Sequence, residues 1–207
     1  MADDDAVQIK LVVVGDGAIG KTCLLIGYEK DEFPTDYIPT VFENVTIDKE
    51  MNINGERREI SLDLWDTAGQ EEFDRLRHLA YRETDIFLLC FSCVEPSSFQ
   101  NLQTRWLPEV QHHSPDALLV LIGLKCDLRN DEKVINNLKE TGKEPVSSEQ
   151  IEEYRKNCGA AAYVETSALK KINVETAFES AISCFLNPSG GGKKKKESGG
   201  GGCCIIV

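Results

Sequence analysis

A glycine-rich loop between an apolar segment and a helical segment constrains the fold of this chain more than any other feature. The loop reads Gly15-Asp-Gly-Ala-Ile-Gly20-Lys21-Thr22 and follows the strand-like run 9–14. Glycines allow a tight loop whose backbone N–H groups converge on phosphate oxygens, and the next helix N-terminus adds partial positive charge. Lys21 supplies a point charge for the phosphates, and Thr22 supplies a hydroxyl for Mg²⁺. The pattern predicts a nucleoside triphosphate site, and leaves kinases, ATPases and GTPases open.

Hydrophobic patterning predicts an α/β fold with a mostly parallel six-stranded sheet and helices on both faces. Apolar runs beside Gly or Asp are typical of strands that are buried on both faces. They lie at Gln8–Val14, Ser61–Trp65, Asp85–Phe91, Leu118–Leu124 and Ala162–Glu165. Segments with apolar residues at helical spacing alternate with them, as in a parallel sheet. Asn54-Gly55, between two extended segments, predicts one antiparallel hairpin.

A second motif follows the segment that ends at Trp65. It contains Asp66, Gly69 and Gln70. An Asp at a strand end can hold Mg²⁺ through water, a following Gly lets a backbone N–H approach the γ-phosphate, and a neighbouring Gln can orient an attacking water. Together with the upstream phosphate loop, this motif favours hydrolysis of the triphosphate.

The charge of the chain is unevenly distributed. Its net charge is -12, but the C-terminal segment 188–207 carries four lysines against one glutamate, so the body 1–187 carries -15. Such an acidic body is a poor general binder of nucleic acid, and we expect no nucleic-acid partner. The segment 188–207 is rich in Gly, Ser and Lys, and we expect it to form a flexible tail after a domain spanning 1–187.

The eight cysteines fall into two groups. The first residues have neither a basic region nor an apolar core, so we expect no signal peptide and a reducing compartment in which the six internal cysteines are free thiols. Cys90 and Cys93 are three apart in a strand-like run and therefore point to opposite faces, so we interpret them as buried thiols and not as metal ligands. Cys204 begins a Cys-Ile-Ile-Val terminus that fits the prenylation motif, with Lys193–Lys196 upstream.

Together these motifs resemble the small GTPases of the Ras superfamily, and within them the Rho/Rac family. The resemblance also covers Phe33-Pro-Thr-Asp-Tyr37-Ile-Pro-Thr40, Leu124-Lys125-Cys-Asp127 and Thr166-Ser167-Ala168-Leu169. It implies a P-loop NTPase G domain over residues 1–187. It also implies that the insert 130–144, which we expect to contain a short exposed amphipathic helix, is the additional helix of Rho-type proteins.

The resemblance assigns a role to individual residues. Gln70 positions the water, while Lys21 and Tyr37 act at the phosphates; Thr22, Thr40 and, through water, Asp66 hold Mg²⁺. Phe33 packs against the guanine, and Asp127 pairs with its polar edge. The implied guanine-nucleotide contacts are Gly15, Asp16, Gly17, Ala18, Ile19, Gly20, Lys21, Thr22, Cys23, Phe33, Tyr37, Thr40, Asp66, Gly69, Lys125, Asp127, Leu128, Ser167, Ala168 and Leu169.

Three positions depart from the family pattern. Leu124 stands where the family has Asn or Thr, which predicts weaker nucleotide retention and faster exchange. Val45 replaces the usual Tyr in the effector segment, which leaves the effectors open. The hairpin 48–58 is about four residues longer than usual, and we expect no catalytic effect from it, because it lies away from the phosphates.

The implied activity is hydrolysis of GTP to GDP and phosphate, slow without an arginine supplied by a GTPase-activating protein. The expected partners are exchange factors, GTPase-activating proteins, a GDP-dissociation inhibitor and effectors, through residues 33–45 and 66–80. A prenyl group on Cys204 and the basic run 193–196 predict attachment to the cytoplasmic face of membranes, with the plasma membrane expected, and a cytosolic pool. The resemblance implies signalling to actin. Two alternatives are a nucleotide-dependent binding module with negligible hydrolysis and a P-loop phosphotransferase.

Overall fold

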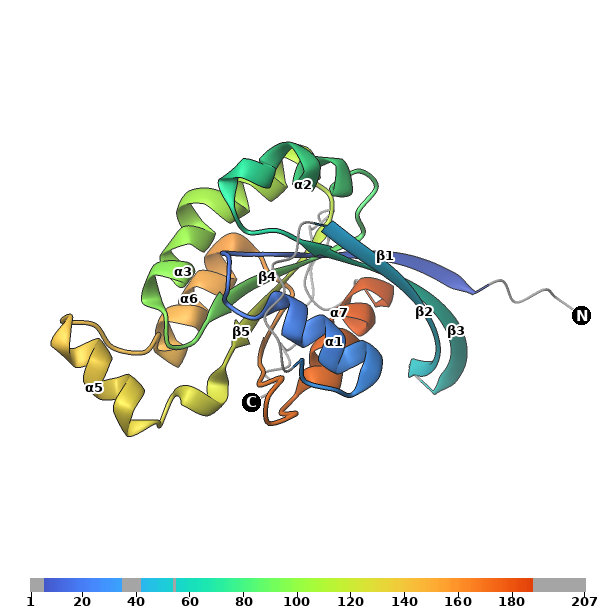
Figure 1. Cartoon of the computed structure of the whole chain (residues 1–207). Coiled ribbons are helices and arrows are strands. Elements are labelled where there is room, and N and C mark those ends of the chain that lie inside the picture. Colours follow the sequence, from blue (N-terminus) through green and yellow to red (C-terminus); the bar gives the residue numbers. More distant parts are fainter. Residues whose placement is uncertain (1–5, 35–41, 54, 188–207) are drawn as a thin grey trace, which may run out of the picture.

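A computed structural model describes residues 6–34, 42–53 and 55–187. One six-stranded sheet, in the order β2-β3-β1-β4-β5-β6, forms the centre of the molecule (Figure 1). All neighbouring pairs are parallel except β2 with β3. The sequence-based prediction of a mostly parallel six-stranded sheet is therefore confirmed. The strands are β1 (Val7–Val14), β2 (Phe42–Ile53), β3 (Glu56–Thr67), β4 (Ile86–Ser92), β5 (Leu118–Leu124) and β6 (Ala162–Glu165).

The antiparallel pair is the predicted hairpin. Ile53 lies opposite Glu56, so the connection has two residues. Gly55 has φ +88°, a left-handed conformation that glycine adopts without steric cost; Asn54 lies outside the described residues. The predicted strand Ser61–Trp65 is only the buried end of a longer strand, because β3 continues to the hairpin as an exposed ribbon that apolar patterning does not detect.

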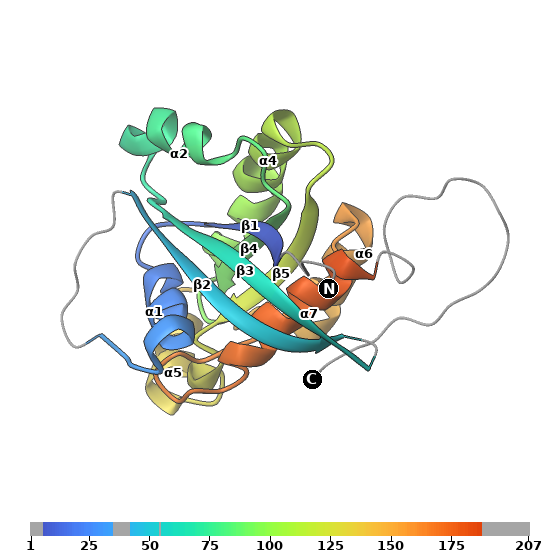
Figure 2. The ribbon, with the colours of Figure 1, turned by 90° about the vertical axis from the view of Figure 1, so that its right-hand side faces the viewer.

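Helices cover both faces of the sheet (Figures 1 and 2). Buried side chains of α1 and α7 form a core with one face, and those of the α3–α4 region and α6 form a second core with the other. No helix in the described parts of the chain combines the length and apolarity needed to cross a membrane. The helices are α1 (Lys21–Lys30), α2 (Asp74–Ala80), α3 (Pro96–Asn101), α4 (Leu107–His113), α5 (Glu132–Glu140), α6 (Ser148–Cys158) and α7 (Val174–Leu186), with short 3₁₀ turns at Glu71–Phe73 and Cys126–Leu128.

A π-helical turn, Leu102–Trp106, joins α3 to α4. At its end the N–H of Leu107 donates to the carbonyl of Leu102, five residues back. Pro108 follows directly and has no N–H to donate to the preceding turn, which disfavours regular α-helical bonding there. Such turns often occur at functional sites.

Cys90 and Cys93 lie in different cores, as predicted. Both are fully buried, Cys90 in the α1–α7 core and Cys93 in the opposite one. Burial raises the pKa of the Cys90 thiol to about 12, so this thiol stays protonated at neutral pH. The described residues contain no group of three or more His, Cys, Asp or Glu side chains that could hold a metal.

The insert contains the expected exposed helix. Helix α5 buries none of its side chains. The Asp131 carboxylate caps it and accepts hydrogen bonds from the N–H groups of Lys133 and Val134, both at 3.0 Å.

Candidate functional site

The site forms where the carboxyl ends of neighbouring parallel strands meet. Strand β1 pairs with β3 on one side and β4 on the other, and Val13 lies opposite Asp66. Because the strands are parallel, the loop after β1 and the loop after β3 leave the sheet at the same edge. The glycine-rich loop and the Asp66 segment, which are well separated in sequence, are therefore neighbours in space.

The glycine-rich loop packs closely against the sheet. A Cβ on Gly15, which has φ +147°, would lie 2.3 Å from the carbonyl oxygen of Cys90. Gly20 has φ +111° and precedes α1 without providing a side-chain cap. The first-turn N–H groups of α1 therefore have no acceptor from an N-cap side chain, which suits an anion at this helix end.

Lys21 lies at the centre of this loop. Only 6% of its surface is exposed, and its ammonium donates to the carbonyls of Gly15 and Asp16 at 2.9 and 2.7 Å. Burial lowers the pKa of Lys21, and the nearby Asp66 carboxylate opposes this effect. An anion in the loop would favour the charged ammonium further.

Thr22 and Asp66 bring two oxygen ligands together. The Thr22 hydroxyl donates to Oδ2 of Asp66 at 2.6 Å. Hydroxyl and carboxylate oxygens are hard ligands that suit Mg²⁺, which usually keeps several waters and binds through few protein groups. These two residues therefore fit the metal role that the sequence predicts for them.

Gly17 and Gln70 lie side by side across the site. A Cβ on Gly17 would lie 3.6 Å from Cδ of Gln70, in ordinary contact, so any larger side chain there occupies the space of the glutamine. Gly69 lies directly against the loop, since its Cβ would be 2.3 Å from the N atom of Gly17. Only glycine permits this approach.

The predicted guanine-binding segments are joined to each other and to the glycine-rich loop. The Cys126 N–H donates to the Thr166 carbonyl at 3.1 Å, which connects the segment of Lys125 and Asp127 to the segment of Ser167. Lys125 donates to the Ala18 carbonyl at 3.1 Å and thereby reaches across the loop.

Leu124 is the last residue of β5, Thr166 directly follows the neighbouring strand β6, and both are buried. The Thr166 N–H donates to the Gly123 carbonyl at 2.7 Å, but its hydroxyl has no hydrogen-bond partner in the described structure. An unsatisfied buried hydroxyl is unfavourable. A leucine at position 124 cannot provide the missing partner.

The remaining predicted residues are placed as follows. Ser167 is buried, and its hydroxyl accepts from the Lys170 N–H at 3.0 Å. Tyr37 and Thr40 lie outside the described residues. Ile19 is buried, Cys23, Asp127, Leu128 and Ala168 are partly buried, and Ala18, Phe33 and Leu169 are exposed.

Sequence reasoning missed the residues that hold Asp16 in place. Its carboxylate accepts from the side-chain amide of Asn101 and from the indole N–H of Trp106, each at 2.7 Å. These donors come from the end of α3 and the π-helical turn, far from Asp16 in sequence. Trp106 lies at helical spacing from Leu102 and Val110, which predicts a core residue, and nothing in the sequence indicates that its polar edge reaches the loop.

Arg77 is a second missed residue. Its side chain is fully buried and pairs with Glu109 at 2.9 Å and Asp74 at 2.6 Å. It also donates to the carbonyls of Ala68 and Gln70, at 2.9 and 3.3 Å. Burial acts to lower the pKa of Arg77, but the hydrogen bonds to Glu109 and Asp74 outweigh it and raise the pKa. Arg77 therefore anchors the backbone around Gln70.

A protein-family model of the Ras family matches residues 10–187 of this chain. The chain belongs to the Ras family. It is therefore a small GTPase, a GTP-hydrolysing switch, as the sequence motifs predicted. Ras-family proteins bind guanine nucleotide and typically Mg²⁺. The match spans every described strand except the first residues of β1.

The contact between Gly17 and Gln70 generates a prediction. In Gly17→Val, the added methyl groups displace the Gln70 side chain, and hydrolysis stimulated by a GTPase-activating protein falls by about 10²-fold or more. Gly17→Ala, whose Cβ would be in ordinary contact with Gln70, serves as the comparison variant with a smaller side chain. Phosphate release in single turnover measures the rate. Near-wild-type stimulated hydrolysis in Gly17→Val, with nucleotide binding intact, would contradict the prediction.

The Thr166 hydroxyl, which has no partner in the described structure, generates a second prediction, on nucleotide release. Leu124→Thr introduces a polar group at the end of β5, next to the strand that Thr166 follows, and we expect GDP release to slow by roughly fivefold, the effect of one recovered hydrogen bond. Release of a fluorescent GDP analogue measures the rate. Leu124→Val, which stays apolar, should keep the wild-type rate; equal release from wild type and the Thr variant would refute the idea.

Proposed function

We propose that this Ras-family protein is a Rho/Rac-type switch that hydrolyses GTP slowly in a Mg²⁺-dependent reaction. The observation that carries the subfamily assignment is helix α5. It follows the guanine-binding segment directly, is capped by Asp131, and leaves all its side chains at least partly exposed. An exposed helix inserted at this point matches the Rho-type resemblance of the sequence, and its free face is available to a partner.

In the proposed reaction, water attacks the γ-phosphorus of GTP, and the bond to the β–γ bridging oxygen breaks. Gln70 orients the water, while Lys21 and the loop N–H groups stabilise the transferring phosphoryl group. Thr22, Thr40 and, through water, Asp66 would hold Mg²⁺, which would supply positive charge beside the phosphate oxygens. The protein contributes position and electrostatics and forms no covalent bond to the phosphate.

The hydrogen bonds of Arg77, the arginine near Gln70, support slow intrinsic turnover. The Arg77 guanidinium is committed to Glu109, Asp74 and two backbone carbonyls. It therefore positions the segment and does not neutralise the phosphates. A partner's arginine is expected to accelerate the reaction by about 10³–10⁵.

The proposed switch acts through the segments around Thr40 and Gly69. Contacts from these residues to the γ-phosphate exist only in the GTP state, so hydrolysis releases residues 33–43 and 66–80 and changes the surface seen by partners. Helix α2 displays Leu76 and Leu79, with 45% and 60% of their surface exposed. These leucines give exchange factors, GTPase-activating proteins, a GDP-dissociation inhibitor and effectors an apolar contact.

We further propose that the C-terminal tail anchors the protein to the cytoplasmic face of membranes, from which it signals to actin. The support for the anchor is the sequence alone: Cys204 in a prenylation motif, and Lys193–Lys196 before it. The proposed signalling to actin rests on the Rho/Rac resemblance. One lipid chain binds a membrane weakly, and each lysine near an anionic surface adds about 1 kcal/mol. Both the tail and Cys204 lie outside the described residues.

Selective stimulation by activating proteins tests the proposed Rho/Rac subfamily assignment. We expect phosphate release from the GTP-loaded protein to rise by about 10³-fold or more with the catalytic domain of a Rho-type GTPase-activating protein, and to stay near the intrinsic rate with a Ras-type domain. Gln70→Leu, matched in size, serves as the unresponsive control. Stimulation by the Ras-type domain alone would overturn the Rho/Rac assignment, and omission of Mg²⁺ without effect would overturn the metal requirement.

Removal of the lipid attachment site tests the anchor. Cys204→Ser should shift the protein from the membrane fraction to the soluble fraction in cells, because the basic run alone binds anionic membranes weakly. Cys203→Ser provides the matched control for loss of a neighbouring thiol. A Cys204→Ser protein that still sediments with membranes would defeat the proposal.

A further inference from the structure

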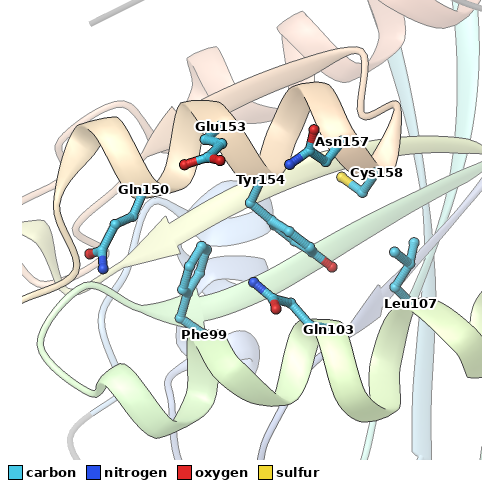
Figure 3. A pocket seen from close by; sticks show the side chains of 8 residues that line it. All are labelled: Phe99, Gln103, Leu107, Gln150, Glu153, Tyr154, Asn157 and Cys158. Atoms are coloured by element: carbon cyan, nitrogen blue, oxygen red, sulfur yellow. The ribbon is translucent and has the colours of Figure 1, made fainter.

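A groove separates the α3–α4 segment from helix α6, away from the nucleotide site. It has a volume of about 520 Å³ (Figure 3). One wall carries Phe99, Gln103 and Leu107, which follow one another at a spacing of four and share a helix face. The other wall comes from α6, so the groove runs between two helices that rest on the same face of the sheet.

The inner part of the groove is apolar and aromatic. The rings of Phe99 and Tyr154 meet edge to face, with centroids 5.4 Å apart and an interplanar angle of 78°. Both residues are more than nine-tenths buried, and Leu107 extends the apolar surface. Such a floor suits a flat or aliphatic body, and aromatic faces also attract cations.

The Tyr154 hydroxyl is the unexplained group of this groove. It is buried and has no hydrogen-bond partner in the described structure. Burial raises the pKa of Tyr154, so the hydroxyl stays protonated and can both donate and accept. Figure 3 shows the side chain extending from α6 across the groove toward the segment of Gln103. A buried hydroxyl without a partner is unfavourable, and a ligand group can satisfy it.

The rim of the groove is negatively charged. Glu153 is the charged residue of the lining, and its neighbours there include the carboxamides of Gln103, Gln150 and Asn157. Within the described residues, no ion pair joins Glu153 to a basic group, whereas the adjacent Glu152 pairs with Arg155 at 2.7 Å. An exposed carboxylate above aromatic rings favours a cationic ligand over an anionic one.

The α3–α4 segment, which forms one wall of the groove, also contacts the nucleotide site. Gln103 belongs to the π-helical turn, a kind of irregularity that is frequent at functional sites. Asn101 and Trp106, on the same continuous α3–α4 segment, donate to Asp16 in the glycine-rich loop. One wall of the groove and the Asp16 donors therefore belong to the same continuous segment.

We propose that this groove binds a small organic cation. Its aromatic or aliphatic body lies over Phe99 and Tyr154, its ammonium group pairs with Glu153, and a hydrogen-bonding group at its other end meets the Tyr154 hydroxyl. The proposal is independent of the Rho/Rac assignment, because it uses no residue of the nucleotide site.

Tyramine tests the proposal because it combines an ammonium group, an aromatic body and a distal hydroxyl. Titrated into the full-length, GDP-bound, ¹⁵N-labelled protein, it should shift amide resonances of α3 and α6 saturably, with a Kd of about 1 mM or below. The anion 3-(4-hydroxyphenyl)propionate has the same ring and hydroxyl, and should give no saturable shift at the same ligand concentrations.

Two substitutions separate the interactions. Glu153→Gln should weaken tyramine binding about tenfold, while Glu149→Gln, on the same helix outside the groove lining, should change it less than about twofold. Tyramine should bind wild type about fivefold tighter than 2-phenylethylamine, which lacks the hydroxyl, and Tyr154→Phe should abolish that difference. Thermal melting confirms that each variant is folded.

Each contrary result overturns the proposal. Absence of saturable shifts excludes the site for this ligand class. Equal binding of tyramine and the anionic analogue, or tyramine affinity unchanged in Glu153→Gln, excludes cation recognition. A preference for tyramine over 2-phenylethylamine that survives in Tyr154→Phe excludes the role of the buried hydroxyl.

Discussion

The parallel pairing of β1 with β3 is the constraint on which the nucleotide site depends. It places Val13 opposite Asp66 and lets the Thr22 hydroxyl reach that carboxylate at 2.6 Å. In an antiparallel arrangement the two loops would leave from opposite edges of the sheet. The close approach of Gly69 to Gly17 follows from the same pairing, so Thr22, Asp66, the glycine-rich loop and Gln70 all lie at one edge of the sheet.

Buried polar contacts then connect this edge to the helices. Asp16 is held by Asn101 and Trp106, and Arg77 ties α2 to Glu109 and to the backbone at Gln70. Breaking a buried ion pair by removing one partner commonly costs about 3–5 kcal/mol, so such contacts hold their segments firmly. The α3–α4 segment, which carries the Asp16 donors, also lines the proposed cation groove. One continuous stretch of chain therefore links that groove to the nucleotide site.

Much of the fold was predictable because burial leaves a pattern in the sequence. The short apolar runs, the Asn-Gly turn and the exposed insert helix were all recognised. Element limits taken from apolar runs were less accurate: the run 61–65 is only part of β3, whose exposed start at Glu56 was covered by the hairpin prediction alone, and β4 is shifted by one position from the predicted run. The π-helical turn escaped notice, because the spacing of apolar residues is similar in α- and π-helical turns, and only Pro108 hinted at irregular bonding.

The sequence by itself determined the expected chemistry of the nucleotide site. A phosphate loop needs closely spaced glycines followed by a lysine and a hydroxyl residue, and this chain shows that spacing, with Lys21 and Thr22 at its end. The tertiary structure alone decided which distant groups complete it. The bonds from Asn101 and Trp106 to Asp16 and the burial of Arg77 have no local signature. The same is true of the Thr166 and Tyr154 hydroxyls, which lack a partner among the described residues. They arise because packing brings together side chains that are far apart in the chain, and hydrogen-bond satisfaction depends on those neighbours.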